Sequence, residues 1–381
     1  MNSRERIFAA LEHREPDVVP IAPYIGWYSS VVLGLDLDDL SRMSMLEQKI
    51  PAKGYIPRWR SDLEAYRRLG MDAILFAPCS AAKNTTRESF KVNRHPRGIL
   101  IHKTYDTPKG PLTEELVCLA GKVGVDNRKY MIDDPEDDLE KVEYVLGDPT
   151  RIDFMEYEQA RYQVGDEGIV AVRCNSPMAF WLTMRGMQDG LLDFWRRRAT
   201  VDKYMKMYGK WIIDYISACG DYQVDLIFFR GTYDGYTIIS PEDWKRYIGE
   251  PLTRASREAG VKIQYFLEGK CAKLLGLVRD TGVNCLGPIE PPPQGDCDLA
   301  KVKSEIGRDV CLRGNITPFE LELASTDKVE KIVVDNIRAG AHSGGFILST
   351  TDQITLQTPV DNVIALVRAA KKYGKYPIMT Q

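Results

Sequence analysis

The sequence lacks the features of a nucleic-acid-binding or a membrane protein. Its formal net charge is -3, from 51 basic and 54 acidic residues, so it offers no general attraction to phosphate backbones or anionic lipid. No apolar run approaches the roughly 18 residues that a membrane span requires. The N-terminal segment, residues 1–21, mixes charges and has no apolar core of the kind found in signal peptides. We therefore expect no nucleic acid and no membrane among its partners.

Closely spaced cysteines are also missing. The chain has eight cysteines, thinly spread, and none of them forms a C-x-x-C pair. This usage argues against a disulfide framework and favours reduced thiols in a cytoplasmic protein. Taken singly, a cysteine of this kind is most often a small buried hydrophobe.

What the sequence does contain is a regular alternation of short apolar runs and helical segments. With 44% hydrophobic residues, the 381-residue chain has ample material for a large core. Alternating strands and helices, with strands apolar on both faces, indicate a parallel sheet, and eight such units predict one (β/α)8 (TIM) barrel over residues 1–381. The expected strands are at residues 18–21, 72–76, 168–173, 225–229, 261–266, 283–287, 310–314 and 344–348.

Four segments carry further signals beside this alternation. Residues 1–70 combine the first strand with an aromatic, Gly/Pro-rich stretch at 27–60, which predicts an N-terminal cap over one end of the barrel. Residues 88–120 contain two alternating runs around a Thr107–Pro111 turn, typical of an inserted hairpin. The acidic run at 133–138 is expected to cap a helix N-terminus. In the segment 295–299, Asp296 is expected to cap a further helix.

Active sites of such barrels lie at the carboxyl ends of the strands, which form the mouth of the barrel. Glu268 and Glu290 directly follow two neighbouring strands, and Asp352 follows the last one. Carboxylates that share a cavity resist ionising together, so these three are the predicted acid–base residues. The predicted substrate-binding residues lie at or after the ends of other strands or in the cap. They are Arg173, Asn175, Arg230, Asp234, Asn315, Tyr24 and Trp27. For the two cap aromatics, packing of the cap against the barrel is an equally good alternative role.

Motifs along the chain resemble the uroporphyrinogen decarboxylase superfamily over about residues 3–375. They are Ser3-Arg4-Glu5-Arg6, Pro16-Asp17 with Val19-Pro20, Ser240-Pro241 with Trp244 and Tyr247, Asp298-Leu299 to Gly307, and Gly314-Asn315-Ile316. The arginine-rich N-terminal motif of true uroporphyrinogen decarboxylases is replaced by Tyr24-Ile25-Gly26-Trp27-Tyr28. The chain is more similar to the corrinoid-dependent methyltransferases of that superfamily, which move methyl groups between small methylated compounds, a separate cobalamin protein and a coenzyme or folate acceptor.

The resemblance also implies a zinc site, but its ligands are not retained. Those methyltransferases bind zinc through a His-x-Cys pair and a later Cys, and the matching positions here are Phe266, Glu268 and, near the last strand, Asp352. Phenylalanine binds no metal, and two oxygen ligands without imidazole or thiolate make a poor zinc site. We therefore expect no metal at these positions. Cys271 is the nearest alternative thiol, although buried packing is the more common role for such a cysteine.

The resemblance and the carboxylates predicted at the mouth of the barrel, Glu268, Glu290 and Asp352, together predict a methyltransferase. A methyl group would pass from an O-, N- or S-methylated compound, with aromatic methyl ethers as one class, to cobalamin, and Glu268 would act as general acid. No Asp-x-His-x-x-Gly signature occurs, so the cobalamin is expected on a partner corrinoid protein. Two alternatives stay open: a cofactor-free decarboxylase in which Arg173 or Arg230 holds a substrate carboxylate, and a ligand-binding protein without catalysis. A homodimer is compatible with either class.

Overall fold

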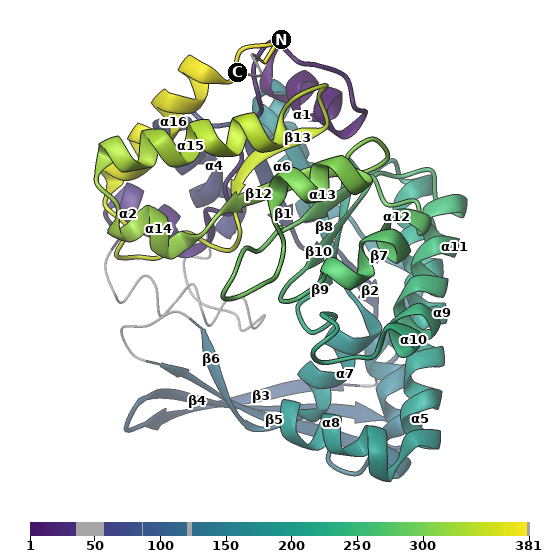
Figure 1. The fold of residues 1–381 in the computed structure, drawn as a ribbon. Coiled ribbons are helices and arrows are strands. Elements are labelled where there is room, and N and C mark those ends of the chain that lie inside the picture. Colours follow the sequence, from purple (N-terminus) through teal and green to yellow (C-terminus); the bar gives the residue numbers. More distant parts are fainter. Residues whose placement is uncertain (36–56, 86, 120–123, 379–381) are drawn as a thin grey trace.

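A computed structural model describes residues 1–35, 57–85, 87–119 and 124–378. Residues 36–56, which make up most of the expected aromatic cap, lie outside these ranges. Figure 1 shows a barrel with both termini near one of its ends and an antiparallel sheet set apart from it on the opposite side.

A curled sheet of seven parallel strands forms the centre of the molecule. The strands follow one another around the sheet in chain order, as a barrel of repeated βα units requires. They are β1 (Ala73–Ala77), β8 (Gly168–Asn175), β9 (Leu226–Gly231), β10 (Ile263–Leu267), β11 (Cys285–Gly287), β12 (Cys311–Ile316) and β13 (Phe346–Thr350). Apolar residues on both faces bury these strands almost completely. The predicted TIM-barrel fold class is confirmed.

The expected strand at residues 18–21 differs from the prediction, because it is not a regular strand. Ile21 makes one isolated parallel bridge to Leu348. The Leu348 N–H donates to the Pro20 carbonyl (2.9 Å), and on the other side the Asp72 N–H donates to the Ile21 carbonyl (2.8 Å). This short segment therefore bridges β13 to the residue that precedes β1. Pro20 has no N–H to donate to a ladder, which explains why the eighth position holds a bridge.

Helices cover the outside of the sheet. The connections after the strands begin with polar caps: the Ser176 hydroxyl accepts from Ala179 N, and Thr317 and Glu320 form a capping box. The helical segments are α1 (Ser3–Leu11), η1 (Gly26–Tyr28), α2 (Ser29–Leu33), α4 (Arg58–Leu69), α6 (Met155–Val164), η2 (Gly165–Glu167), α7 (Pro177–Arg185), α8 (Met187–Arg196), α9 (Arg198–Asp221), α10 (Pro241–Trp244), the π-helical η3 (Lys245–Gly249), α11 (Glu250–Glu258), η4 (Ala272–Leu274), α12 (Leu275–Asp280), α13 (Leu299–Ile306), α14 (Pro318–Leu323), α15 (Thr326–Gly340) and α16 (Val360–Tyr373). Within the described ranges, none of the helices combines the length and the apolar character needed to cross a bilayer.

The antiparallel sheet occupies the region where the sequence suggested a hairpin. Strands β4 (Gly98–Thr107) and β5 (Gly110–Leu119) form that hairpin, and β3 (Arg87–His95) and β6 (Val125–Lys129) extend it to four strands. A second antiparallel pair, β2 (Ser80–Ala82) and β7 (Asp148–Asp153), lies on either side of this insertion in the chain.

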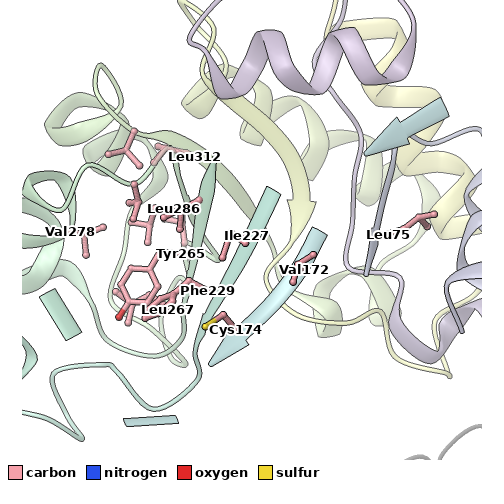
Figure 2. Packing of buried hydrophobic residues seen from close by; sticks show 14 of the residues in the cluster. Leu75, Val172, Cys174, Ile227, Phe229, Tyr265, Leu267, Val278, Leu286 and Leu312 are labelled. Atoms are coloured by element: carbon pink, nitrogen blue, oxygen red, sulfur yellow. The ribbon is translucent and has the colours of Figure 1, made fainter. Parts of the chain in front are cut away.

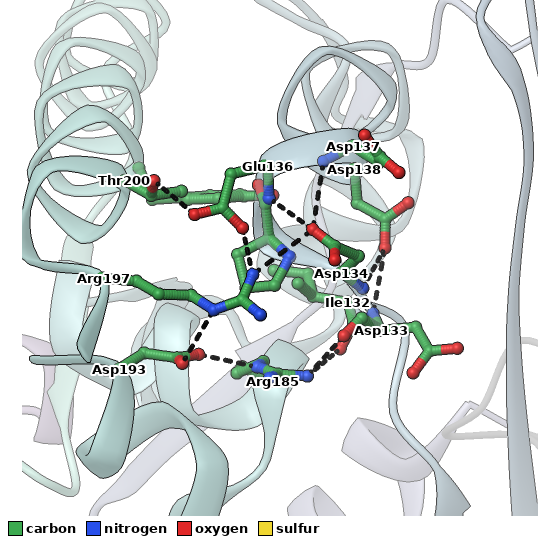
Figure 3. Close-up of polar contacts among 12 residues, drawn as sticks. Ile132, Asp133, Asp134, Glu136, Asp137, Asp138, Arg185, Asp193, Arg197 and Thr200 are labelled. Carbon is green, nitrogen blue, oxygen red and sulfur yellow. Dashed lines mark hydrogen bonds and ion pairs between the residues drawn. The ribbon is translucent and has the colours of Figure 1, made fainter.

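The acidic run caps a helix as predicted. Helix α5 (Pro135–Leu146) begins after Asp134, whose carboxylate accepts from the Glu136 N–H (2.9 Å). Arg197 pairs with both Asp134 and Glu136, and Figure 3 shows these contacts together with the neighbouring Arg185–Asp193 pair (2.8 Å). The run thus joins α5 to the segment between α8 and α9.

Side chains of the parallel strands separate into an outer and an inner layer, because successive residues of a strand point to opposite faces. The outer layer packs against the helices, and Figure 2 shows part of it, including Val172, Phe229, Tyr265 and Leu312. The inner layer fills the barrel and includes side chains of α1, which close its amino-terminal end. Its strand members are Ile74, Ile169, Ala171, Leu226, Phe228, Phe266, Cys285, Cys311 and Ile347.

Candidate active site

Strand alternation assigns the mouth residues to the inside of the barrel. Phe228 and Phe266 belong to the inner layer, so the residues two positions further on, Arg230 and Glu268, continue the same inward-facing rows. Arg173 continues the row of Ala171 in the same way. These three polar side chains therefore follow the last apolar layer toward the carboxyl end of the sheet.

Glu268 is the residue whose protonation is most affected by this location. Partial burial, followed by the charge of Asp352 and then that of Glu290, raises the pKa of Glu268 to about 8, against an opposing effect of Arg230. This shift favours the protonated, uncharged form of Glu268 at neutral pH. A carboxyl group with such a pKa can donate a proton to a substrate near pH 7.

The other two carboxylates are held by backbone N–H groups. Burial raises the pKa of Glu290 despite the Gly269 N–H, which donates to its Oε2 (2.6 Å). Asp352 is an exposed residue as a whole, but its carboxyl group is partly desolvated, which raises the pKa of that carboxyl. The Gln353 N–H, which donates to Asp352 Oδ1 (2.6 Å), and the charge of Arg230 oppose this effect. The structure thus brings Glu268, Glu290 and Asp352 within electrostatic reach of one another.

Four aromatic rings form a floor below these charges. The ring centroids of Phe76 and Phe228 are 4.8 Å apart, those of Phe228 and Phe266 are 5.0 Å apart, and those of Tyr24 and Phe266 are 5.2 Å apart. Tyr24 and Phe266 are each 5% exposed. The predicted pocket residue Tyr24 is therefore part of this floor.

A buried network of hydrogen bonds beside the aromatic floor was not predicted from the sequence. The fully buried Arg313 donates to Gln264 Oε1 (3.0 Å) and to the Ala22 carbonyl (2.7 Å), and its guanidinium lies 3.9 Å from the Tyr24 ring centroid. Gln264 Nε2 donates in turn to the Tyr24 hydroxyl (2.6 Å). The available signal was a polar residue at an inward position of an apolar strand, since Gln264, Phe266 and Glu268 alternate along one face.

Three other predicted substrate-binding residues, Trp27, Arg173 and Asn175, lie in three separate places. Trp27 is 7% exposed in η1, with the Arg58 guanidinium 4.5 Å from its ring centroid. The Arg173 guanidinium lies 4.4 Å from the centroid of the Phe76 ring, at the edge of the aromatic floor. Asn175 is half-buried in the last position of β8.

Asp234 and Asn315 are engaged by neighbouring groups. The fully buried Asp234 accepts from the Ser176 and Tyr265 hydroxyls (both 2.7 Å), and burial raises its pKa to about 7. Tyr265 belongs to the outer layer, so these contacts hold Asp234 there and not in the carboxylate group. Asn315 donates to the Ile289 carbonyl (3.1 Å), which ties the end of β12 to the segment just after β11.

The positions of the family's zinc ligands do not suit zinc. Phe266 is packed in the aromatic floor and offers no donor atom. Glu268 and Asp352 offer only carboxylate oxygens, without the imidazole or thiolate on which zinc sites of this kind rely.

The comparisons with known proteins agree with this architecture. A methyltransferase from Methanosarcina mazei superposes with a TM-score of 0.67 over 98% of this chain and 99% of that chain, at 15% identity, which establishes the common fold. A uroporphyrinogen decarboxylase from Crocosphaera subtropica is 35% identical over 75 residues, and the match spans 20% of this chain and 21% of that protein's length. Residues 132–373 match the model of the family described as Uroporphyrinogen decarboxylase (URO-D), and the chain therefore belongs to the uroporphyrinogen decarboxylase family.

Proposed function

We propose that this protein is a methyltransferase that passes a methyl group from a small O-methylated compound to a corrinoid carried by a separate protein. The observation that carries the proposal is the position of Glu268 directly after β10, in an inward-facing row and within electrostatic reach of Asp352, Glu290 and Arg230. These surroundings raise its pKa to about 8, which suits a general acid. The common fold with a methyltransferase from Methanosarcina mazei supports the same reaction class.

The leaving oxygen is the difficult part of methyl ether cleavage. When the methyl–oxygen bond breaks, its electron pair stays on oxygen, and an alkoxide or phenoxide leaves poorly. The reduced corrinoid of the partner supplies the nucleophile that takes the methyl group. Glu268 gives its proton to the departing oxygen, so that an alcohol or a phenol leaves, and the Glu268 carboxylate later regains a proton from water. Such an acid contributes about a hundred- to ten-thousand-fold in rate.

The neighbours of Glu268 suit both of its protonation states. Asp352 and Glu290 raise its pKa and so favour the protonated form before the reaction. Arg230 opposes them and interacts favourably with the carboxylate that remains after proton transfer. In this proposal Glu290 and Asp352 tune the acid, and Arg230 limits the cost of its ionisation.

The aromatic floor favours an aryl methyl ether as the donor. Its rings present apolar edges and faces with centroids 4.8–5.2 Å apart, and flat aromatic groups pack well against such surfaces. The floor is directly below the predicted acid in the inward rows of β9 and β10, so a phenyl ring resting on it would bring an ether oxygen toward Glu268.

A decarboxylase is the second candidate, and the membership of the uroporphyrinogen decarboxylase family favours it. Arg173 or Arg230 would hold a substrate carboxylate, and Glu268 would protonate the carbanion that remains after carbon dioxide leaves. This reaction needs no corrinoid, which separates it from the leading proposal.

The test is incubation of the purified protein with reduced corrinoid protein and a panel of methylated phenols, alcohols, amines and thioethers. We expect corrinoid-dependent release of a demethylated phenol or alcohol, together with a change in cobalt absorbance. Carbon dioxide release from a carboxylic acid without corrinoid would select the decarboxylase. Ligand binding with no turnover under either condition would contradict both enzymes.

The pH profile provides a second prediction. If protonated Glu268 is the acid, kcat/KM for the methyl ether should fall as pH rises through about 8, with the slope of a single ionisation, because the active form is lost. The measurement is the initial rate between pH 6 and pH 10 at saturating corrinoid protein. A rate that stays level to pH 10 would exclude this role for Glu268.

A further inference from the structure

Two thiols and a carboxylate meet behind the mouth, where the loops after β10 and β11 come together. The sulfur atoms of Cys271 and Cys297 are 3.3 Å apart, and Cys297 Sγ lies 3.9 Å from Asp296 Oδ1. One ligand atom from each of the three residues lies within 4.8 Å of the others. Cys271 is fully buried and Cys297 is 1% exposed. Among the residues that the structure describes, this is the one group of His, Cys, Asp and Glu side chains with such spacing.

The structure gives Asp296 a different position from the one the sequence suggested. The N-cap of α13 is Asp298, whose side chain accepts from Lys301 N (2.9 Å). Asp296 Oδ1 instead accepts from the backbone N–H groups of Cys271 (2.9 Å) and Ala272 (3.1 Å), and Oδ2 accepts from the Tyr236 hydroxyl. These contacts fix the carboxylate beside the two buried thiols before any ligand binds.

We propose that Cys271, Asp296 and Cys297 form a binding site for a thiophilic divalent cation, with zinc as the first candidate. Zinc takes thiolate and carboxylate ligands at about 2.3 and 2.1 Å, and a tetrahedral arrangement then separates two sulfurs by roughly 3.7 Å and a sulfur from an oxygen by roughly 3.5 Å. The observed sulfur–sulfur separation of 3.3 Å and the 3.9 Å between Cys297 Sγ and Asp296 Oδ1 are each within about 0.4 Å of these values. The ligand atoms of Cys271 and Asp296 lie within 4.8 Å of one another, so binding would also draw these two groups closer together. Binding releases both thiol protons, and a water molecule completes the coordination.

This site is separate from the positions of the zinc ligands in the related methyltransferases, which match Phe266, Glu268 and Asp352 here. A cation bound at it would act on the positions of neighbouring loops. Cys271 is three residues after Glu268, and the Cys297 N–H donates to the Glu290 carbonyl (3.0 Å). The Gly269 N–H donates to the Glu290 carboxylate (2.6 Å). An ion between the two cysteines would cross-link the loops that carry Glu268 and Glu290, so its role would be to position them without touching the substrate.

The chain contains a matched control. Cys285 and Cys311 are also adjacent, since they are register partners on β11 and β12 and both are fully buried. They lie in the apolar inner layer and are not part of the thiol–carboxylate group. Two neighbouring thiols alone should therefore bind the cation much more weakly than two thiols with a fixed carboxylate.

The test is metal binding by the full-length protein, measured without any activity assay. The protein is treated with a chelator and a thiol reductant, loaded with zinc or cobalt(II), and dialysed, and its metal content is measured by mass spectrometry. We expect about one ion per chain and, with cobalt(II), a thiolate-to-metal charge-transfer absorption. The Cys271→Ser and Cys297→Ser variants should lower the affinity by more than about tenfold, whereas Cys311→Ser should retain it.

Asp296→Asn keeps an oxygen that can accept the two backbone N–H groups while removing the ligand charge. It should also weaken the binding of zinc by more than about tenfold in a folded protein, as judged by circular dichroism. Wild-type protein that retains no metal after loading, or full metal retention in the Cys271→Ser/Cys297→Ser variant, would overturn the proposal. A disulfide between the two cysteines in place of bound metal in the reduced, loaded protein would overturn it as well.

Discussion

Glu268→Gln is expected to slow demethylation of a methyl ether by about a hundred- to ten-thousand-fold. Glutamine has nearly the same shape as protonated glutamic acid and can still donate a hydrogen bond, but it cannot transfer a proton to the leaving oxygen. The measurement is the single-turnover rate of phenol or alcohol release with reduced corrinoid protein in excess. A variant that reacts at the wild-type rate would show that Glu268 is not the acid.

The dependence on the leaving group makes this prediction more specific. The loss in Glu268→Gln should be largest for an alkyl methyl ether and smallest for a nitrophenyl methyl ether, because a nitrophenoxide leaves without help from an acid. Glu258→Gln is the matched control. Glu258 is exposed and pairs with Arg254 (2.8 Å) at the end of α11, the helix that precedes the amino-terminal end of β10, whereas Glu268 follows the carboxyl end of that strand. The rate of the Glu258→Gln variant should therefore be unchanged for either substrate.

Glu268→Gln should lower activity but raise the stability of the fold at high pH. The pKa of Glu268 is raised from its usual 4.5 to about 8, so between these values the unfolded carboxyl is ionised while the folded one keeps its proton. The wild type therefore loses stability as pH rises through this window, and glutamine, which never ionises, does not. We expect Glu268→Gln to be more stable by on the order of 2–4 kcal/mol at pH 8.5 and nearly equal at pH 4. Denaturant unfolding at both pH values measures this, and a less stable variant at pH 8.5 would contradict it.

The sequence allowed the barrel and its inner face to be predicted because both depend on local patterns. Apolar runs of five or six residues indicate buried parallel strands, and the two-residue period then assigns Arg230 and Glu268 to the inside. The prediction of a regular strand at residues 18–21 was wrong for a local reason too. Pro20 has no N–H to donate to a strand ladder, and the segment makes only the single parallel bridge between Ile21 and Leu348. The proline is visible in the sequence, so this difference also depends on a local pattern.

The remaining features depend on which loops meet in space. Asp296 and Asp298 are equally suited to cap α13 from sequence alone, and the free N–H groups of Cys271 and Ala272 decide that Asp296 turns away from the helix. Asp234 follows β9 as the mouth residues follow their strands, yet the Tyr265 hydroxyl of β10 holds it in the outer layer. Such outcomes are set by tertiary contacts, which a pattern within one segment does not contain.

Asp225 is expected to show the largest effect on stability among the described ion pairs. Its carboxylate is 4% exposed and pairs with Arg4 through two contacts (2.7 and 2.8 Å) and with Arg161 (3.2 Å). It also accepts from the Val170 N–H (3.0 Å). Asp225→Ala leaves two partly buried cations and one buried N–H without this partner, so the free energy of unfolding should fall by about 3–5 kcal/mol. Denaturant unfolding at neutral pH measures the change.

The comparison with an exposed pair shows whether burial is the cause. Glu258→Ala removes the exposed contact with Arg254 on α11, and such surface pairs contribute only about 0.5 kcal/mol. Asp225→Asn keeps an oxygen for the Val170 N–H but removes the charge, so its loss should lie between those of Asp225→Ala and Glu258→Ala. Because Asp225 joins α1 and α6 to the start of β9, away from the carboxyl ends of the strands, the folded Asp225→Asn variant should keep the wild-type turnover. Equal losses in Asp225→Ala and Glu258→Ala would mean that the buried carboxylate does not hold these elements together.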